Sequence, residues 1–427
     1  VAALSAAVAA AMAVTKAAAF SAHVLTPMQE RGKADSEAGK FGKAPKKCVV
    51  TGGTGFVGQR LVEMLVERGA ERVVSFDVVP PPDNVWRHPA IEYVVGDLCD
   101  LEAVEQAVRG ADCVWHNGAC VGPYHPVEVY SRVNVGGTKN VIAACRKHGV
   151  KKLVYSSSPS TRFTADAQDV DGLTEEEMPK LPQAAYVQDY AKTKAEGELL
   201  VRAECDDALL TIAVAPHQVY GPRDNLFLPN LLEVAGLGKL RVFGGGKNRI
   251  CFTYVDNYCH ALILGERALY QGSPALGKFY IATDGETHPE SQGFCEFWKE
   301  MEKVIVSLGF TSIMAKVHLP AWFMLTLGWL CDVVGSCLGR KFKLSKFAVR
   351  MLIMHRWFRI DAIKRDLGYQ PLVGFGEGWT DTVGWFRQYW LPTFSASASG
   401  LTGDVARQTQ RKIDIQSASA LSSDKTD

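Results

Sequence analysis

Three glycines that follow a short β-branched run constrain the fold of this chain most. Residues 48–58 read CVVTGGTGFVG, which places Gly52, Gly55 and Gly58 at a fixed spacing. This pattern is typical of a strand that breaks into a tight turn and then starts a helix. Because a helix N-terminus presents free N–H groups and a partial positive charge, such a turn suits the pyrophosphate of a dinucleotide. The segment therefore predicts a dinucleotide-binding α/β fold.

The next predicted strand, residues 72–77, ends in the residue that distinguishes between two dinucleotides. This residue is Asp77, about 20 positions beyond the glycines, where an acidic side chain is expected to bind a ribose diol. A carboxylate there would repel a 2′-phosphate, so we expect NAD as the cofactor rather than NADP. The alternative interpretation of Asp77 is a surface acid at a strand end.

Apolar strands alternate with amphipathic helices through the first half of the chain. Such alternation implies parallel strands with helices on both faces, so we predict a Rossmann-type, doubly wound α/β sheet over residues 46–224. A smaller C-terminal substrate lobe, residues 225–390, is expected to interleave with that domain. The strands are expected near residues 46–51, 72–77, 91–95, 112–116, 151–157 and 209–215.

Tyr190 and Lys194 indicate which kind of reaction the chain would catalyse. They lie four residues apart at the start of a predicted helix and therefore share one helix face. An ammonium beside a phenol lowers the pKa of the phenol, which makes the phenolate a usable base near neutral pH. A serine that follows strand 151–157 would hydrogen-bond the same substrate oxygen, with Ser158 as first choice and Ser157 as the alternative. Together these groups predict removal of a hydroxyl proton while a hydride leaves the same carbon for nicotinamide.

Further segments match one family in order along residues 46–390. They are residues 51–58, 96–98, 115–119, 132–140 and 215–224, together with the pair described above. On these segments the chain resembles the extended short-chain dehydrogenase/reductase superfamily, and within it the 3β-hydroxysteroid dehydrogenase branch. The resemblance implies that Asp97 contacts the adenine and that Asn134 supports the backbone of the active site. It implies cofactor contacts at Gly52, Gly55, Phe56, Val57, Gly58, Asp77, Asp97, Leu98, Asn117, Gly118, Ala119, Asn134, Tyr190, Lys194, Pro216, His217 and Val219.

The resemblance also implies an activity. It implies NAD-dependent oxidation of the 3β-hydroxyl of a 4α-carboxysterol, followed by loss of CO₂, in sterol biosynthesis. Three alternatives stay open: a 3β-hydroxysteroid dehydrogenase that also shifts a Δ5 double bond to Δ4, a nucleotide-sugar epimerase, and a non-enzymatic cofactor-sensing scaffold on a membrane. A carboxylate substrate would need a cation, for which Arg223, Lys247 and Arg249 are the candidates.

Composition excludes several other classes of protein. The formal net charge of +1 argues against nucleic acid as a partner. The 11 cysteines form no Cys-x-x-Cys pair and their number is odd, so we expect reduced thiols in a reducing compartment. His116, His217 and His260 do not have the spacing of metal ligands, and we expect no metal site.

Residues 317–360 predict contact with a membrane. An apolar stretch, residues 317–338, is followed by a stretch without acids, residues 333–360, that holds seven Lys and Arg side chains interleaved with aromatic residues. This pattern suits a surface that dips into a bilayer and faces anionic headgroups. The alternative is a helical lid over the substrate. We expect a sterol substrate, the cytosolic face of the endoplasmic reticulum membrane, and a homodimer.

Both ends of the chain differ in composition from the rest. Residues 1–26 are rich in alanine, a composition that suits either a processed targeting segment or an interfacial helix. A targeting segment would offer an alternative to the endoplasmic reticulum, because it would direct the chain to another organelle. Residues 27–45 are expected to be a linker. Residues 391–427 are rich in Ser, Ala, Thr, Gln and Asp, and are expected to be a disordered tail.

Overall fold

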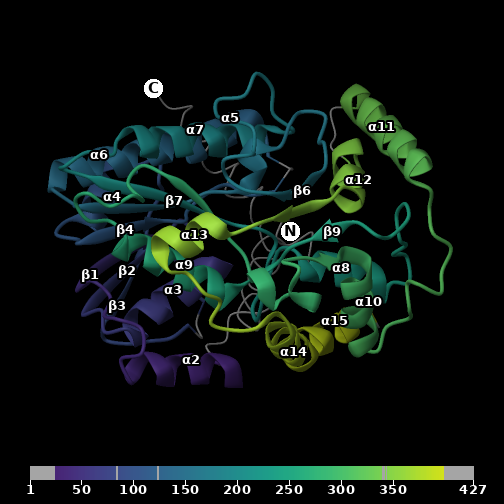
Figure 1. The fold of residues 1–427 in the computed structure, drawn as a ribbon, viewed down its shortest axis with the longest axis horizontal. Helices are drawn as coiled ribbons and strands as arrows, with labels where there is room; N and C mark the ends of the chain where they lie inside the picture. Colours follow the sequence, from purple (N-terminus) through teal and green to yellow (C-terminus); the bar gives the residue numbers. More distant parts are fainter. Residues whose placement is uncertain (1–24, 83–84, 123–124, 339–341, 343, 399–427) are drawn as a thin grey trace, which may run out of the picture.

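A seven-stranded parallel sheet forms the centre of the molecule (Figure 1). The computed structural model describes residues 25–82, 85–122, 125–338, 342 and 344–398. The strand order is β11-β7-β5-β4-β1-β2-β3, so the chain moves outward from β1 first in one direction and then in the other. The strands are β1 (Lys47–Thr51), β2 (Arg72–Asp77), β3 (Ile91–Val95), β4 (Cys113–His116), β5 (Lys152–Ser156), β7 (Leu210–Pro216) and β11 (Phe279–Ala282).

The predicted doubly wound α/β fold is confirmed. Six strands lie within about two residues of their predicted positions, and the seventh, β11, was not predicted as part of the sheet. Helices cover both faces (Figure 1). One face carries α3 (Phe56–Glu67) and α9 (Val255–Arg267); the other carries α4 (Leu101–Val108), α6 (Thr138–His148) and α7 (Asp189–Ala203).

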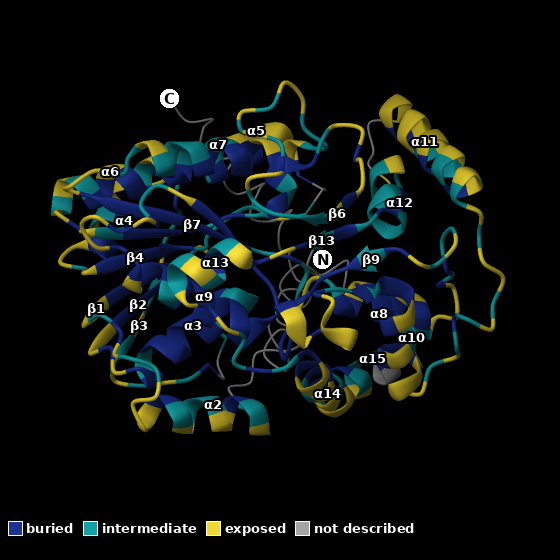
Figure 2. Ribbon diagram, viewed as in Figure 1, coloured by how far each residue is buried: buried dark blue, intermediate teal, exposed yellow. Residues whose placement is uncertain are grey.

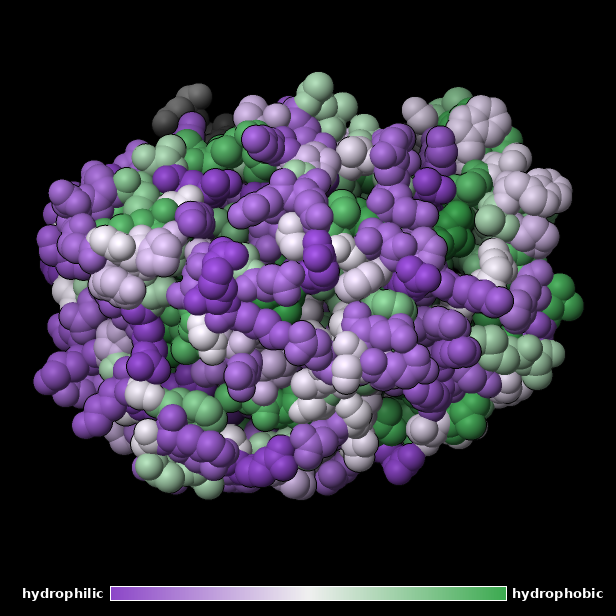
Figure 3. All heavy atoms as spheres, in the orientation of Figure 1, coloured by the Kyte–Doolittle hydropathy of each residue, from purple (hydrophilic) through white to green (hydrophobic). Residues whose placement is uncertain are grey.

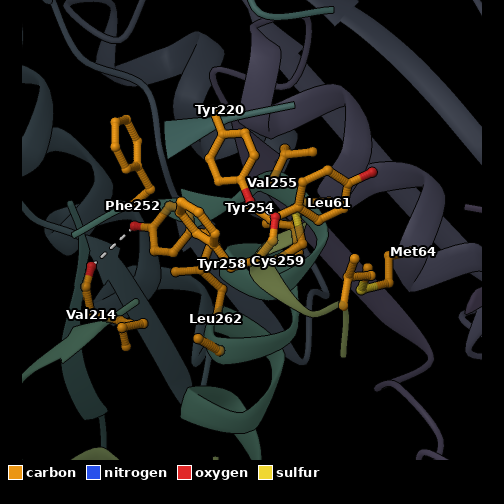
Figure 4. Close-up of a cluster of buried hydrophobic side chains, with 14 of the residues drawn as sticks. Leu61, Met64, Val214, Tyr220, Phe252, Tyr254, Val255, Tyr258, Cys259 and Leu262 are labelled. Carbon is orange, nitrogen blue, oxygen red and sulfur yellow. Dashed lines mark hydrogen bonds between the residues drawn. The ribbon is translucent and has the colours of Figure 1, made fainter. Parts of the chain in front are cut away.

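Helix α9 is the more deeply buried of the two helices on the face that carries α3 and α9. Every residue from Val255 to Ile263 is buried. Figure 4 shows how its side chains meet Leu61 and Met64 of α3 on one side and β7 on the other. The Tyr258 hydroxyl donates to the Val214 carbonyl at 3.1 Å, which satisfies a polar group inside an apolar cluster.

A smaller four-stranded sheet lies beside the central one, in the order β12-β9-β13-β6. Its strands are β6 (Val170–Leu173), β9 (Arg249–Ile250), β12 (Cys295–Glu296) and β13 (Arg356–Phe358), and a separate pair joins β8 (Val219–Tyr220) to β10 (Thr253–Tyr254). The remaining α-helices are α2 (Pro27–Glu37), α5 (Val127–Tyr130), α8 (Leu228–Gly236), α10 (Phe297–Ser307), α11 (Ala321–Cys337), α12 (Lys346–Ile353), α13 (Asp361–Leu367), α14 (Phe375–Trp385) and α15 (Leu391–Ala398). Short 3₁₀ or π turns occupy Ser131–Gly137, Pro159–Arg162, Gly285–Thr287, Pro289–Ser291 and Phe386–Trp390.

Part of the predicted N-terminal linker is an ordered helix. Thr26 caps α2 with a full capping box, and the buried Gln29 donates to Asp256 of α9 at 3.2 Å. Asp256 also accepts from the buried guanidinium of Arg60, which pairs with Glu67 at 2.7 Å. A linker was expected because the segment is polar, but its polar side chains here complete a buried charge network. Residues 1–24 of the predicted targeting segment lie outside the described residues.

The first residues of the predicted disordered tail, 391–398, are helical. Residues Leu391–Ala398 continue as α15, and Phe394 is buried against Phe310 and Trp390. The rest of the predicted tail, residues 399–427, lies outside the described residues.

Helix α11 stands apart from the body and is largely exposed (Figure 2). It packs on α12, where Gly328 meets the backbone of Lys346 so closely that a Cβ would come within 2.8 Å of the Lys346 nitrogen. Asp332, the one acid of the apolar stretch, accepts from that same N–H at 2.9 Å and so caps α12. Among the described residues, no helix combines the length and the apolar character that crossing a bilayer requires.

The basic residues after α11 that the structure describes do not all face outward. Arg340, Lys341 and Lys343 lie outside the described residues, while Lys346 is exposed. Arg359 pairs with Glu177 at 2.8 Å. Arg356 was expected to face lipid headgroups, and this is wrong because β13 carries it into the interior, where it is 9% exposed.

Candidate active site

The glycine turn lies at the carboxyl edge of β1 and leaves the start of α3 free of side chains. Gly52 has φ +68°, and a Cβ on it would lie 2.8 Å from the Cα of Gly118, so only glycine fits. A Cβ on Gly58 would overlap the carbonyl of Gly52. Gly55 caps α3 without any side-chain hydrogen bond, and a Cβ on it would meet only the Gly52 oxygen, at 3.2 Å. The free N–H groups that start at Phe56 and Val57 therefore fit a phosphate-bearing ligand.

Asp77 lies beside this turn because β2 pairs with β1 in parallel register. Its carboxylate accepts from the Thr54 N–H at 3.1 Å and from the Val79 N–H at 3.1 Å. The side chain is thus fixed next to the turn, where the ribose of a bound dinucleotide would lie.

The loop after β4 runs beneath the turn and contains an unsatisfied amide. Both polar atoms of the Asn117 side chain are buried and have no partner within the described part of the chain. The Gly118 N–H donates to the Thr51 hydroxyl at 3.0 Å, and Ala119 continues the loop. Leu98 packs against Gly118, and Asp97 accepts from the Cys99 N–H at 2.9 Å. An orphaned amide is costly unless a ligand satisfies it, so this loop also fits a polar cofactor.

Tyr190 and Ser158 are brought together by α7 and by the turn that follows β5. The Ser158 hydroxyl lies near enough to the Tyr190 hydroxyl to act on the pKa of the phenol, and it lies 2.8 Å from the Ser160 hydroxyl. Ser157 points elsewhere: it is buried, and its hydroxyl donates to Glu198 at 2.7 Å. The two serines therefore have different partners although they are adjacent in the chain.

Lys194 lies on the same face of α7 as Tyr190 but holds its ammonium against β5. Its Nζ donates to the Ser156 carbonyl at 2.6 Å and lies 4.2 Å from the centroid of the Tyr155 ring. Burial lowers the pKa of Lys194 to about 7, and the nearby Glu198 opposes that change.

The pKa of Tyr190 moves opposite to the expectation from sequence. Removal from water raises it to about 12, the neighbouring Tyr130 adds to the increase, and the hydrogen bond from Ser158 opposes it. The expected lowering by Lys194 is wrong, because removal of the phenol from water is the largest influence on its pKa and the Lys194 ammonium is directed toward Ser156 and Tyr155 instead of Tyr190.

Asn134 joins the two halves of the site. It lies in the π-helical turn Ser131–Gly137, a kind of irregularity that is common at functional sites. Its amide nitrogen donates to the Thr193 hydroxyl of α7 at 3.2 Å, and its oxygen accepts from the Cys120 N–H at 2.7 Å. It therefore fixes the loop after β4 relative to the helix that carries Tyr190.

Pro216, His217 and Val219 follow the carboxyl end of β7. His217 is buried, and burial lowers its pKa to about 3, so the imidazole is neutral near pH 7. Its Nδ1 lies 2.8 Å from the Cys251 carbonyl, while its Nε2 has no partner among the described residues. One nitrogen of a neutral imidazole at this edge is thus left for a ligand.

None of the three cations expected to bind a substrate carboxylate is available inside the site. Arg223 makes two hydrogen bonds to Glu63, at 2.7 and 2.8 Å. Arg249 pairs with Asp171 at 3.0 Å on the surface, and Lys247 is exposed. Sequence reasoning could not foresee these pairings, because each joins segments that are distant in the chain.

The structure reveals two buried polar residues that the sequence interpretation did not assign to the site. They are Arg356 of β13 and Asn248, which precedes β9. The signal that could have indicated β13 is the aromatic pair Trp357-Phe358, because aromatic residues favour strands. Within the described residues, no group of His, Cys, Asp or Glu side chains is arranged to hold a metal ion, and all the cysteines are free.

Comparisons with known proteins agree on one family. Residues 49–309 match the model described as the 3-beta hydroxysteroid dehydrogenase/isomerase family. Over 338 residues the chain is 35% identical to 2-alkyl-3-oxoalkanoate reductase of Stenotrophomonas maltophilia, which covers 78% of this chain and 97% of that protein. Over 350 residues it is 33% identical to sterol-4-alpha-carboxylate 3-dehydrogenase, decarboxylating, of Homo sapiens, which covers 80% of this chain and 88% of that protein.

The similarity to solved structures concerns the fold alone. The epimerase Mth375 of Methanothermobacter thermautotrophicus superposes with a TM-score of 0.63 at 21% identity, over 86% of this chain and 97% of that chain.

The lowered pKa of Lys194 predicts how stability depends on pH. Its folded pKa of about 7 lies below the ordinary value of 10.5, so the unfolded chain binds more protons between these values. The free energy of unfolding contributed by this group should therefore rise as pH increases through that window. Lys194→Met removes this contribution, and the stability difference between variant and wild type should change by roughly 2–4 kcal/mol between about pH 7 and pH 10 in urea titrations. Lys192→Met, an exposed neighbour, is the control. A difference that stays constant with pH would contradict the prediction.

Proposed function

This chain belongs to the 3-beta hydroxysteroid dehydrogenase/isomerase family, and we propose that it oxidises the 3β-hydroxyl of a 4α-carboxysterol with NAD and releases CO₂, in sterol biosynthesis. The observation that carries the proposal is that Tyr190, Lys194 and Ser158 come together at the same sheet edge as a glycine turn that fits a dinucleotide. The chain is 33% identical to the human protein named sterol-4-alpha-carboxylate 3-dehydrogenase, decarboxylating, over most of both chains, and this similarity supports the choice of substrate.

The residues of this chain have distinct roles in the proposed reaction. Tyr190 takes the proton of the 3β-hydroxyl, and Ser158 orients the same oxygen by a hydrogen bond. Lys194 holds the ribose and supplies positive charge near the phenol when a ligand draws it from Ser156. Bound NAD supplies the acceptor for the hydride and a positive ring that favours the phenolate, and Asp77 favours NAD over NADP.

The decarboxylation needs no further residue. Oxidation at C3 gives a ketone whose neighbouring carbon, C4, carries the carboxylate. When the C–C bond to that carboxylate breaks, CO₂ leaves and the electron pair enters the new carbonyl as an enolate, which then takes a proton at carbon.

One relative favours a second candidate function. The Stenotrophomonas maltophilia protein is named for a 2-alkyl-3-oxoalkanoate, which is also an acid with oxygen on the carbon next to the one that bears the carboxylate. This chain would then interconvert a 2-alkyl-3-oxo acid and its 3-hydroxy form. The two candidates share their chemistry and differ in the size of the substrate.

Turnover of defined substrates tests the proposal. Purified protein with NAD and a 4α-carboxysterol should produce reduced cofactor and CO₂, and Tyr190→Phe should lower kcat by at least about 100-fold, because the variant has no hydroxyl to accept the proton. Tyr270→Phe, an exposed tyrosine elsewhere, is the control. Turnover of 2-alkyl-3-oxo acids alone would favour the second candidate, whereas epimerisation of a nucleotide sugar without sterol turnover would refute both.

The serine assignment makes a separate prediction. Ser158→Ala should lower kcat by about 10-fold to 100-fold with little change in thermal stability, because it removes a hydrogen bond to the reacting oxygen. Ser157→Ala should instead lower the free energy of unfolding by about 1–2 kcal/mol, since it leaves the buried Glu198 with one donor fewer. The reverse pattern in the two variants would assign the role to Ser157.

We further propose that α11 binds the cytosolic face of the endoplasmic reticulum membrane, where a sterol would be dissolved. The support is the exposure of its apolar side chains: Trp322 is 69% exposed and Trp329 53%, with Phe323, Leu330, Val333 and Val334 on the same helix. Figure 3 shows hydrophobic and pale residues over α11 at the upper right. A large exposed apolar surface favours an interaction site. The homodimer stays a prediction.

Co-flotation with vesicles that contain anionic lipid tests this placement. Trp322→Ser combined with Trp329→Ser should weaken vesicle binding by about 30-fold or more, because two large apolar side chains no longer enter the lipid. Leu237→Ser, an exposed apolar residue on another element, is the control. Equal binding by all three proteins would exclude α11 as the contact.

A further inference from the structure

The inward face of the small sheet carries polar groups without partners. Arg249 of β9 and Trp357 of β13 point outward, since both bind the exposed Asp171, at 3.0 and 2.5 Å. Side chains alternate along a strand, so Ile250 and Arg356, which pair in register, point inward. Phe358, two residues after Arg356, shares that face.

This inward face is directed toward the carboxyl edge of the central sheet. The Phe358 ring lies 5.1 Å from the imidazole of His217, which follows β7, and stacks near Phe163, which follows the serine turn. The Cys251 N–H donates to the Arg356 carbonyl at 3.2 Å, while the Cys251 carbonyl lies 2.8 Å from the His217 Nδ1. The strand that holds Arg356 is therefore attached directly to the segment that follows β7.

Arg356 is a buried cation without an anion. It is 9% exposed, its Nε is buried without a partner, and no ion pair or hydrogen bond joins its guanidinium to any described residue. Burial lowers its pKa to about 10, and its charge in turn lowers the pKa of His217. A buried guanidinium normally has a carboxylate partner, because an isolated buried charge is costly.

Asn248 adds an unsatisfied amide to the same face. It is 5% exposed, both polar atoms of its side chain lack partners in the described part of the chain, and it lies two residues before Ile250. Since Ile250 pairs with Arg356 across the parallel strands, Asn248 is two residues from the direct neighbour of Arg356. With the free Nε2 of His217, three buried polar groups near this edge await a partner.

We propose that Arg356, assisted by the amide of Asn248, binds the carboxylate of the substrate. The ligand class is a 3-hydroxy or 3-oxo acid with a carbon substituent at C2, which both candidate substrates satisfy. The guanidinium offers paired N–H donors that match a carboxylate, and the incoming anion supplies the missing charge. This inference rests on the proposed function, because it names the part of that substrate which selects it. It replaces Arg223 and Arg249, whose charges are already paired.

Binding without turnover tests the inference separately from the function. We would measure dissociation constants of the protein with reduced NAD for a 3β-hydroxy-4α-carboxysterol and for its 4α-methyl counterpart, so that no oxidation occurs. The wild type should bind the acid more tightly, and Arg356→Met should weaken binding of the acid by roughly 30-fold to 100-fold while leaving the methyl compound unchanged. Arg359→Met, three residues further on and outward, is the matched control and should bind both ligands like the wild type.

Thermal unfolding without ligand separates ligand binding from a structural role. Since Arg356→Met removes an unpaired buried charge, Tm should stay the same or rise by a few degrees. A fall in Tm together with equal weakening of both sterols would overturn the inference, as would a variant that still prefers the acid. If the wild type binds the acid through Arg356 but does not oxidise it with NAD, the inference stands and the proposed reaction fails.

Discussion

Parallel pairing of β1, β4, β5 and β7 is the constraint on which the site depends. Parallel strands end at the same edge of a sheet, so the segments that follow them must converge there. The glycine turn follows β1, the orphaned Asn117 follows β4, the serines follow β5 and His217 follows β7. Residues spread over more than 160 positions of sequence are thus brought to one edge of the sheet.

The molecule compensates the buried charge of Arg60 within the fold but leaves the buried cations at the carboxyl edge without a paired acid. On the face of the sheet that carries α3 and α9, Arg60 is surrounded by Glu67, Asp256 and Glu63, so its burial is compensated within the fold. At the carboxyl edge, the Lys194 ammonium contacts a carbonyl and a ring directly and has only the nearby Glu198 as an opposing charge, and Arg356 has no acid or acceptor partner among the described residues. Groups prepared for a ligand lower the stability of the empty protein, a common cost of function.

The peripheral elements show how distant segments complete the domain. Helix α2 contributes Gln29 to the charge network of α3 and α9, and the insertion after the serine turn contributes β6 to the small sheet. Helix α11 is the exception, since its apolar side chains are held out of the core by a contact with α12 at Gly328. In the described structure these apolar side chains are exposed.

Local patterns in the sequence determined the sheet, the turn and the helix that carries Tyr190 and Lys194. Each of these is set by short-range rules: apolar alternation, the freedom of glycine, and a spacing of four residues on one helix face. Tertiary structure alone decided which charges are paired. Arg223 and Arg356 look alike as basic residues in a sequence, yet one meets Glu63 across 160 positions and the other meets no acid among the described residues. It also set the direction of the Tyr190 pKa, because desolvation depends on what surrounds a group in three dimensions and not on its neighbours along the chain.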